Sequence, residues 1–235
     1  MLRAMRAADR GCSVGGVTGR GVVLCGSIAA LLVVAGAASA SSPGKEKIAY
    51  TAVGQAKAKA ELLKRTDVGS GWSGGSRKPD VSSTLPCSYR PKQDDLVLIG
   101  AAETDWRQAG YEIDSEAQVL RTADMVRRDW RRTVLAPQVV PCLRQGFEKS
   151  LGSAGTLVSF GRVAFPHVAP LTQAFRAVFK VNTGSTTVPV EIDVLGLGGG
   201  RNEITLTLTG LAARRSALHT AEVRFARRLA GRMRP

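Results

Sequence analysis

The sequence is poor in the residues that usually build catalytic or metal sites. It contains only two histidines among 235 residues, His167 and His219. A zinc-type site needs at least three protein ligands, and a catalytic triad needs a base within reach of its nucleophile. Glu222 follows His219 by one helical turn, which offers two ligands but no third. We interpret both histidines as surface residues and predict no catalytic residue, no metal site and no cofactor.

Only one long apolar run is present, and it lies near the N-terminus. Residues 21–37 are almost entirely apolar or small, and Ala38, Ser39 and Ala40 follow them. A basic start, an apolar run and a small-x-small ending are the layout of a secretory signal. The sequence therefore predicts a signal peptide over residues 1–40 and an extracellular or wall-associated chain beginning at residue 41. The basic residues of the leader are Arg3, Arg6, Arg10 and Arg20.

Two other interpretations of this leader stay open. A run of about 17 residues is at the short limit for spanning a bilayer, so it could act as an uncleaved anchor. Its basic flank would then stay inside and leave the rest of the chain outside. A lipoprotein would need a cysteine at the end of the run, whereas Cys25 lies early in it.

Cysteine is scarce as well, and its distribution is informative. Of four cysteines, Cys12 and Cys25 fall in the predicted leader, while Cys87 and Cys142 remain in the exported part. Two cysteines in an exported chain predict one disulfide. The bridge would close about 55 residues and stabilise the fold by about 4 kcal/mol. It would leave no free thiol for catalysis, redox chemistry or metal binding.

Acidic residues are too few to balance the basic ones. Lys and Arg number 33 against 19 Asp and Glu, a net charge of +14. The exported part keeps about +11, which outside the cell favours anionic lipid, wall polymer or a small amphiphilic ligand, and neither nucleic acid nor nucleotide. A GC-rich genome would enrich arginine in the same way, so solvated helix faces remain the alternative. The arginines that could contact an anionic surface are Arg127, Arg128, Arg131, Arg132, Arg224, Arg227, Arg228 and Arg232.

The remaining length suffices for one substantial core. We predict residues 41–60 as a leader and the start of a first helix, and residues 61–235 as a single exported domain of class α+β. Runs of strands with helices before, between and after them predict a mostly antiparallel sheet of about five to six strands. N-terminal, middle and C-terminal helices should pack on it.

Periodicity divides the first half of the domain as follows. Residues 45–65 have helical spacing, and the glycine-rich stretch after them reads as a loop up to residue 86. Residues 96–102 read as a buried strand and 111–119 as a half-exposed strand with a solvated acidic face. A helix over 122–134 should end at Pro137 and Pro141, and a short helix should cover 142–151.

The second half alternates between apolar and polar residues, as strands of an antiparallel meander do. The predicted strands are 157–165, 172–182, 187–197 and 203–211. Pro189 cannot donate to a ladder, so we expect a sheet edge or a bulge there. A last helix over 216–232 should bury the stripe Leu218, Ala221, Phe225, Leu229 and Met233.

Three motifs suggest chemistry but lack the structural setting that the chemistry needs. Residues 71–75 match G-x-S-x-G, yet a nucleophile elbow requires a strand before Ser73 and a helix after it. Residues 196–201 are glycine-rich, but they connect two strands and so predict a hairpin turn rather than a phosphate loop. Glu112, Asp114 and Glu116 share one strand face without any sign of a pocket around them. We also expect Trp72 to fill an apolar gap beside the disulfide.

The order of several motifs resembles a known family. They are Leu62-Leu63, Asp67, Gly71-Trp72 and Cys87, then Val119, Trp130 and Cys142, then the strand 202–210 leading into the helix 221–232. Over residues 61–232 the chain resembles exported actinobacterial proteins related to the extracellular sensor domain of mycobacterial receptor serine/threonine kinases. The resemblance implies a sheet with flanking helices, a ligand-binding cleft and no assigned catalysis.

The chain departs from that family in two respects. It carries no kinase domain, and it has one expected disulfide where those sensors typically carry two. Signal transduction and binding residues are therefore not transferred. We expect a secreted or envelope binding module of sensor-like type, not an enzyme. The alternatives are a hydrolase acting on envelope material and a structural or accessory protein without a ligand.

Overall fold

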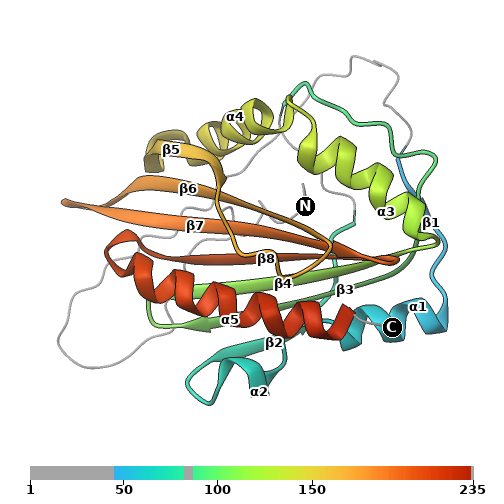
Figure 1. The fold of residues 1–235 in the computed structure, drawn as a ribbon. Coiled ribbons are helices and arrows are strands. Elements are labelled where there is room, and N and C mark those ends of the chain that lie inside the picture. The colour runs from blue at the N-terminus through green and yellow to red at the C-terminus, as the bar shows by residue number, and fades with distance from the viewer. Residues whose placement is uncertain (1–44, 82–86, 234–235) are drawn as a thin grey trace.

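The computed structural model describes residues 45–81 and 87–233 (Figure 1). The predictions made for the leader, including its cleavage site, Cys12 and Cys25, lie outside the described residues. The proposed division at residues 40 and 60 stays a prediction. Among the helices of the described part, none combines the length and the apolar character that crossing a bilayer requires.

The predicted α+β class is confirmed, with a larger sheet than expected. Within the described residues the sheet has eight strands in the order β1-β3-β4-β8-β7-β6-β5, and β2 pairs with β3 outside this path. Every pairing is antiparallel except the parallel contact of β1 with β3. The strands are β1 (Lys47–Ile48), β2 (Ser73–Arg77), β3 (Val97–Gln108), β4 (Tyr111–Leu120), β5 (Gly155–Val163), β6 (Leu171–Thr183), β7 (Thr186–Gly199) and β8 (Asn202–Leu211).

Helices cover both faces of the sheet, as Figure 1 shows. They are α1 (Ala52–Ala60), α2 (Arg65–Val68), α3 (Ala123–Trp130), α4 (Val139–Leu151) and α5 (Arg215–Met233). The neighbours Gly198 and Gly199 on β7 point to opposite faces. A Cβ at Gly198 would lie 3.3 Å from the ring of Trp130 on α3, and one at Gly199 would lie 3.6 Å from Met233 on α5. Helices α3 and α5 are therefore separated by the sheet.

The second half of the chain folds as its alternation predicts. The four strands there are confirmed, each within a few residues of its expected bounds. Ile204, Leu206 and Leu208 are buried against α5, whose predicted apolar stripe packs on them. Pro189 lies at an edge, because β8 begins to pair with β7 only at Val190. The glycine-rich residues 196–201 form the β7–β8 hairpin, as predicted.

The first helix is shorter than predicted, because the chain before it pairs with the sheet. The Ala49 amide donates to Leu98 O at 2.9 Å, which holds β1 in extended conformation. The Thr51 side chain then accepts from the Gly54 amide and starts α1 at Ala52. Helix α1 crosses β3 so closely that a Cβ at Gly100 would lie 2.1 Å from Gly54 O. Only glycine fits at this crossing.

The glycine-rich segment after α1 contains two elements where a loop was predicted. They are the short helix α2 and the strand β2, which pairs with β3 from Ser73↔Arg107 to Arg77↔Glu103. Strand β3 in turn extends to Gln108, six residues beyond its predicted end. Trp72 packs against the core beneath α5 and not beside the disulfide, so that expectation was wrong.

The middle helices also differ from the prediction in their ends. Helix α3 ends at Trp130 and continues as a π-helical turn, Arg131–Leu135. Pro141 does not end a helix but lies in the first turn of α4. Proline is tolerated there because the amide it lacks would have no partner within the helix.

The predicted disulfide is present between Cys87 and Cys142, whose Cα atoms are 5.4 Å apart. It joins the segment before β3 to α4. Below it, α3 and α4 pack on β5, β6 and β7 through an aromatic cluster, in which the Phe147 and Phe179 rings lie 5.2 Å apart. The bridge therefore fixes the helical layer on this face.

Candidate binding site

The two predicted rows of arginines lie on opposite faces of the sheet, so they do not form one surface. In the π-helical turn after α3, Arg132 forms two hydrogen bonds with Asp95, at 2.7 and 3.1 Å, and donates to Lys92 O at 2.8 Å. Arg128 also contacts Asp95, at 3.5 Å. The hydrogen bond from Arg132 holds the pKa of Asp95 below its usual value. This row mainly anchors the segment that leads into β3.

The other two arginines of this row face solvent. Arg127 lies 3.4 Å from Asp124 within its own helix, with both side chains more than half exposed. Arg131 is exposed in the π-helical turn. Such exposed pairs contribute little to stability, so these residues serve as useful controls for surface charge.

The α5 row divides into structural and free arginines. Arg228 and Arg232 donate to Asp67 Oδ1 at 2.9 and 2.8 Å. Burial acts to raise the pKa of Asp67, but hydrogen bonds from the Lys64 amide and these two arginines outweigh it and lower the pKa. Arg232 also donates to Leu62 O at 2.6 Å. Both arginines therefore tie α5 to α2.

Arg224 and Arg227 are exposed, and no carboxylate of the described residues pairs with them. Arg224 lies over the ring of Phe225, 4.7 Å from its centroid. It also borders every cavity described below. Of the eight predicted arginines, Arg224 is the one that borders the crevice between α5 and the sheet.

A crevice of about 210 Å³ opens between α5 and the sheet. Four separate segments build it: Trp72 before β2, the β3–β4 hairpin with Tyr111, the end of β8 with Leu208, and the first half of α5 with Arg224. Its lining is largely apolar, and its polar members are Gln108, Glu112, Thr209 and Arg224. The lining residues are Trp72, Gln108, Tyr111, Glu112, Ile113, Leu208, Thr209, Ala217, Leu218, Ala221 and Arg224.

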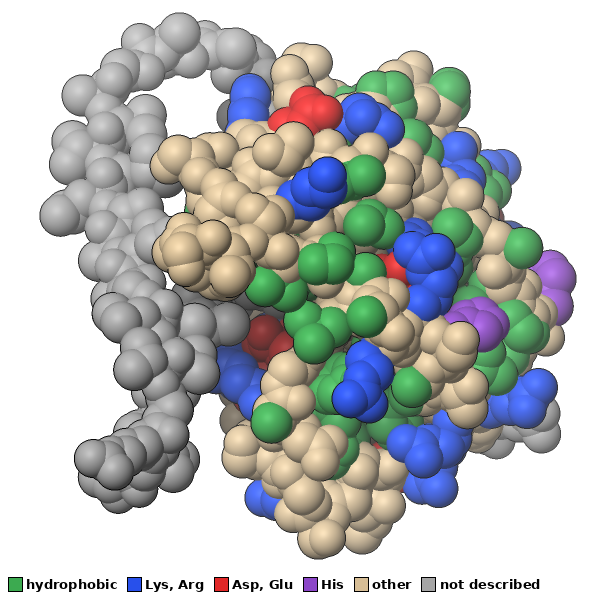
Figure 2. Space-filling model, turned by 90° about the vertical axis from the view of Figure 1, so that its left-hand side faces the viewer, with side chains coloured by type: hydrophobic (Ala, Val, Ile, Leu, Met, Phe, Trp, Pro, Cys, Tyr) green, Lys and Arg blue, Asp and Glu red, His purple; other side chains and the backbone are tan. Residues whose placement is uncertain are grey.

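Two shallow grooves continue from Arg224 along the outer side of α5. One holds about 520 Å³ and is lined by His219, Arg227 and their neighbours, and the other holds about 430 Å³ near Ser216. Figure 2 shows the face on the left of Figure 1, where Lys and Arg side chains are scattered among apolar and neutral ones and acidic side chains are few. The Lys and Arg side chains visible in this view are therefore spread over the surface and do not form one patch. At the crevice, by contrast, Arg224 lies beside a defined cavity.

A buried cluster of charges lies beneath the start of α5. Arg176 on β6 donates to both oxygens of Asp193 on β7, at 2.7 and 2.8 Å. Arg215 on α5 donates to Glu191 at 2.6 Å. Glu222 lies below His219, whose Nδ1 is 3.5 Å from its carboxyl oxygen. Burial, followed by the charge of Asp193, raises the pKa of Glu222 to about 8.

The raised pKa values of three buried carboxyl groups predict that the fold is less stable in mildly alkaline solution. The pKa of Glu222 is about 8 in the folded protein against 4.5 for the free group, and those of Glu61 and Asp114 are about 7. The folded state therefore binds more protons than the unfolded one between about pH 4.5 and 8, and stability falls as pH rises through this window. Glu222→Gln should reduce the fall by at least about 1.4 kcal/mol, the equivalent of one pKa unit.

Urea unfolding at pH 5 and pH 8.5 measures this difference. The exposed Glu148→Gln serves as the matched control and should leave the pH dependence unchanged. If the stability of wild type and Glu222→Gln depended equally on pH, Glu222 would not have the raised pKa in the folded protein.

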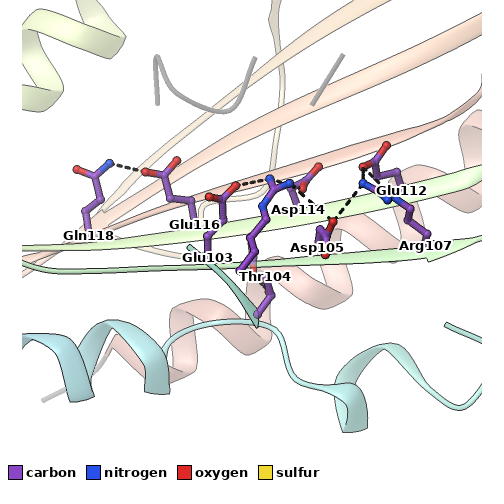
Figure 3. A network of polar contacts seen from close by, with 10 residues as sticks. Glu103, Thr104, Asp105, Arg107, Glu112, Asp114, Glu116 and Gln118 are labelled. Carbon is purple, nitrogen blue, oxygen red and sulfur yellow. Dashed lines mark hydrogen bonds and ion pairs between the residues drawn. The ribbon is translucent and has the colours of Figure 1, made fainter. Parts of the chain in front are cut away.

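A second polar region lies on the sheet face opposite α1 and α5 (Figure 3). Arg77 on β2 contacts Glu103, and also Asp114 at 2.8 Å and Asp105 at 3.7 Å. Arg107 lies 3.1 Å from both Asp105 and Glu112. Figure 3 shows these carboxyl groups on one side of β3 and β4, whereas Thr104 points to the other side.

The predicted solvated acidic face of β4 was therefore wrong. Asp114 is 5 % exposed and Glu116 is 7 % exposed. The compensating Arg77 comes from β2, an element that the sequence did not indicate. Burial, followed by the charge of Glu112, raises the pKa of Asp114 to about 7.

The serine and histidines considered in the sequence lie in different parts of the fold. Ser73 lies in β2, where its hydroxyl donates to Arg107 O at 3.2 Å, and the next element in the described part of the chain is the strand β3. His167 is exposed in the β5–β6 loop, with Nδ1 3.3 Å from Ala169 O. His219 Nδ1 lies 3.5 Å from a carboxyl oxygen of Glu222, and its ring packs edge-on against the ring of Phe165. Over the described ranges, no three His, Cys, Asp or Glu side chains are placed to hold a metal ion.

Comparison with known proteins gives a resemblance of fold. No protein-family profile and no curated protein matches the chain. The extracellular domain of PknH from Mycobacterium tuberculosis has 11% identity and a TM-score of 0.38, over 73% of this chain and 95% of that chain. LpqN, described as involved in cell envelope biogenesis of Mycobacterium tuberculosis, has 13% identity and a TM-score of 0.29, over 65% and 87%.

The first match agrees with the resemblance to receptor-kinase sensor domains expected from the sequence. At this level of identity and TM-score, neither match carries an argument about ligand, partner or role.

Proposed function

We propose that this protein is an exported binding module of the cell envelope that takes an anionic amphiphile at the α5 crevice. One observation carries the proposal: Arg224, without a carboxylate partner among the described residues, borders a crevice walled by Trp72 and Tyr111. An apolar chain would enter between the aromatic rings, and an anionic group would pair with Arg224. Arg227, on the adjoining groove, adds a second cation for a larger head group.

The predicted leader and the disulfide between Cys87 and Cys142 support a place outside the cytoplasm, because structural disulfides persist in oxidising compartments. The net charge of +14 supports attraction to anionic surfaces in general. Charge alone is unspecific and screened by salt. The crevice adds specificity, because apolar walls beside a cation favour a ligand that has both an apolar part and an anionic group.

The experiment is binding to vesicles of phosphatidylglycerol and phosphatidylcholine, compared with vesicles of phosphatidylcholine alone. Each basic residue near an anionic surface contributes about 1 kcal/mol, so Arg224→Gln with Arg227→Gln should weaken binding about 30-fold. Trp72→Ala should weaken binding at high salt, where the apolar contact remains and the charge term is screened. Co-sedimentation and tryptophan fluorescence measure both effects.

The matched control carries the same loss of charge on the other face of the sheet. Arg127→Gln with Arg131→Gln should leave vesicle binding nearly unchanged. Equal weakening in both pairs would reject the crevice and leave only diffuse attraction. Polyphosphate, which has no apolar part, serves as a second control: binding it as tightly as the vesicles would reject the amphiphile.

A further inference from the structure

The polar face of β3 and β4 has a charge opposite to that of the chain as a whole. Two guanidinium groups lie there, those of Arg77 and Arg107. They face five carboxyl groups, all on one side of the two strands and close together in Figure 3: Glu103, Asp105, Glu112, Asp114 and Glu116. A local excess of carboxylates in a strongly basic protein favours a cationic ligand.

Buried oxygens without partners lie at the centre of this face. Asp114 Oδ2 and Thr207 Oγ1 have no hydrogen-bond partner among the described residues, although Asp114 is 5 % and Thr207 is 2 % exposed. The two residues are directly opposite each other on β4 and β8, which puts their side chains on the same face. A buried polar group without a partner is costly. Above its pKa of about 7, Asp114 is ionised and only accepts hydrogen bonds, so the missing partner there must be a donor.

The spacing of the carboxyl groups favours an extended cation over a compact one. Glu112, Asp114 and Glu116 alternate along β4, so neighbours on this face are roughly 7 Å apart. No group of three such side chains in the described part of the chain is close enough to hold a metal ion. Access is from the β3–β4 turn, because the Glu112 side chain is 21% exposed and that of Asp114 is 7% exposed.

We propose that this acidic face is a second binding site, which takes a linear oligoamine lying along β4. One ammonium group donates to Asp114 Oδ2 and Thr207 Oγ1 in the interior, and another pairs with Glu112 near the surface. Arg77 stays in place between Glu103 and Asp114 and spaces the carboxyl groups. Apart from Glu112, which also borders the α5 crevice, this site lies on the other face of the sheet, and it does not depend on the function proposed for the crevice.

Titration calorimetry with spermidine tests the proposal, at low salt and at pH 8, which is above the pKa of about 7 of Asp114. Spermidine should bind saturably, and the monoamine butylamine at least about tenfold more weakly, because only one ammonium group can be accommodated. Asp114→Asn should weaken spermidine binding at least about tenfold, the loss expected for one charge-assisted hydrogen bond. Thr207→Val should weaken it by a smaller factor.

Asp124→Asn on α3 is the matched control, since it removes the same charge from an exposed position and should not change the affinity. Glu112→Gln provides a second test at a more exposed position, 21% against 7% for Asp114, in case Asp114→Asn unfolds. Absence of saturable binding to the wild type would overturn the proposal. So would equal affinities of Glu112→Gln and Asp124→Asn for spermidine.

Discussion

Replacing Cys87 and Cys142 together with alanine should lower the free energy of unfolding by about 4 kcal/mol. The bridge spans a sequence separation of 55 residues, so its loss greatly enlarges the conformational freedom of the unfolded chain. It also frees the segment before β3 from α4, which covers the aromatic cluster of Phe147, Phe160, Phe175 and Phe179. For a domain of this size, the loss corresponds to a melting temperature lower by roughly 10 °C.

Guanidinium unfolding with and without dithiothreitol measures the effect. The wild type should lose the same stability when it is reduced, while the double alanine variant should not respond to reductant. If reduction left the wild type unchanged, the two sulfurs would not be joined in solution. The single variants are less informative, because each leaves one free thiol that can form intermolecular disulfides.

The sequence predicted those parts of the fold that local patterns determine. Ile204, Leu206 and Leu208 alternate with polar residues because β8 lies between a core and a polar face. Leu218, Phe225 and Leu229 repeat at helical spacing because one side of α5 is buried. The disulfide followed from cysteine number and export. Each of these predictions used only the pattern of one segment or the number of one residue type. None of them required knowledge of contacts between distant parts of the chain.

Strands β1 and β2 were missed because neither has a pattern of its own. Lys47–Ile48 is too short for alternation, and Ser73–Arg77 contains two glycines and no apolar residue. Both are strands only because β3 offers free backbone groups along its outer edge. Propensity disfavours glycine in strands, and tertiary pairing overrides it here.

The burial of the acidic face was missed for a related reason. Asp114 and Glu116 alternate with Ile113 and Ser115 as in a half-exposed strand, and nothing local distinguishes a solvated carboxylate from a paired one. The distinguishing residue is Arg77, which lies far away in sequence on β2. The crevice was missed for the same reason, because the residues Trp72, Tyr111 and Arg224 that line it come from three segments far apart in the sequence. Only Arg224 among them belonged to the predicted site.

Arg77→Met should be the most damaging single substitution on the polar face, at about 3 kcal/mol of unfolding free energy. The guanidinium is the cation that Glu103 and Asp114 share, and its side chain is only 17% exposed. Removing it leaves two partly buried carboxylates to repel each other in a region of low dielectric constant. Protonation relieves this repulsion, so the loss should be smaller at pH 5 than at pH 8.

Arg107→Met is the matched control within the same network. Arg107 also contacts two carboxylates, Asp105 and Glu112, but its side chain is 50% exposed, so its loss should cost less than about 1 kcal/mol. Adding Asp114→Asn to Arg77→Met should restore part of the stability, because the carboxylate that lost its cation is removed with it. Urea unfolding of the four proteins, wild type included, at both pH values provides the comparison. If Arg77→Met and Arg107→Met both lost little unfolding free energy, water would reach Asp114 freely. The polar face would then not be an environment of low dielectric constant.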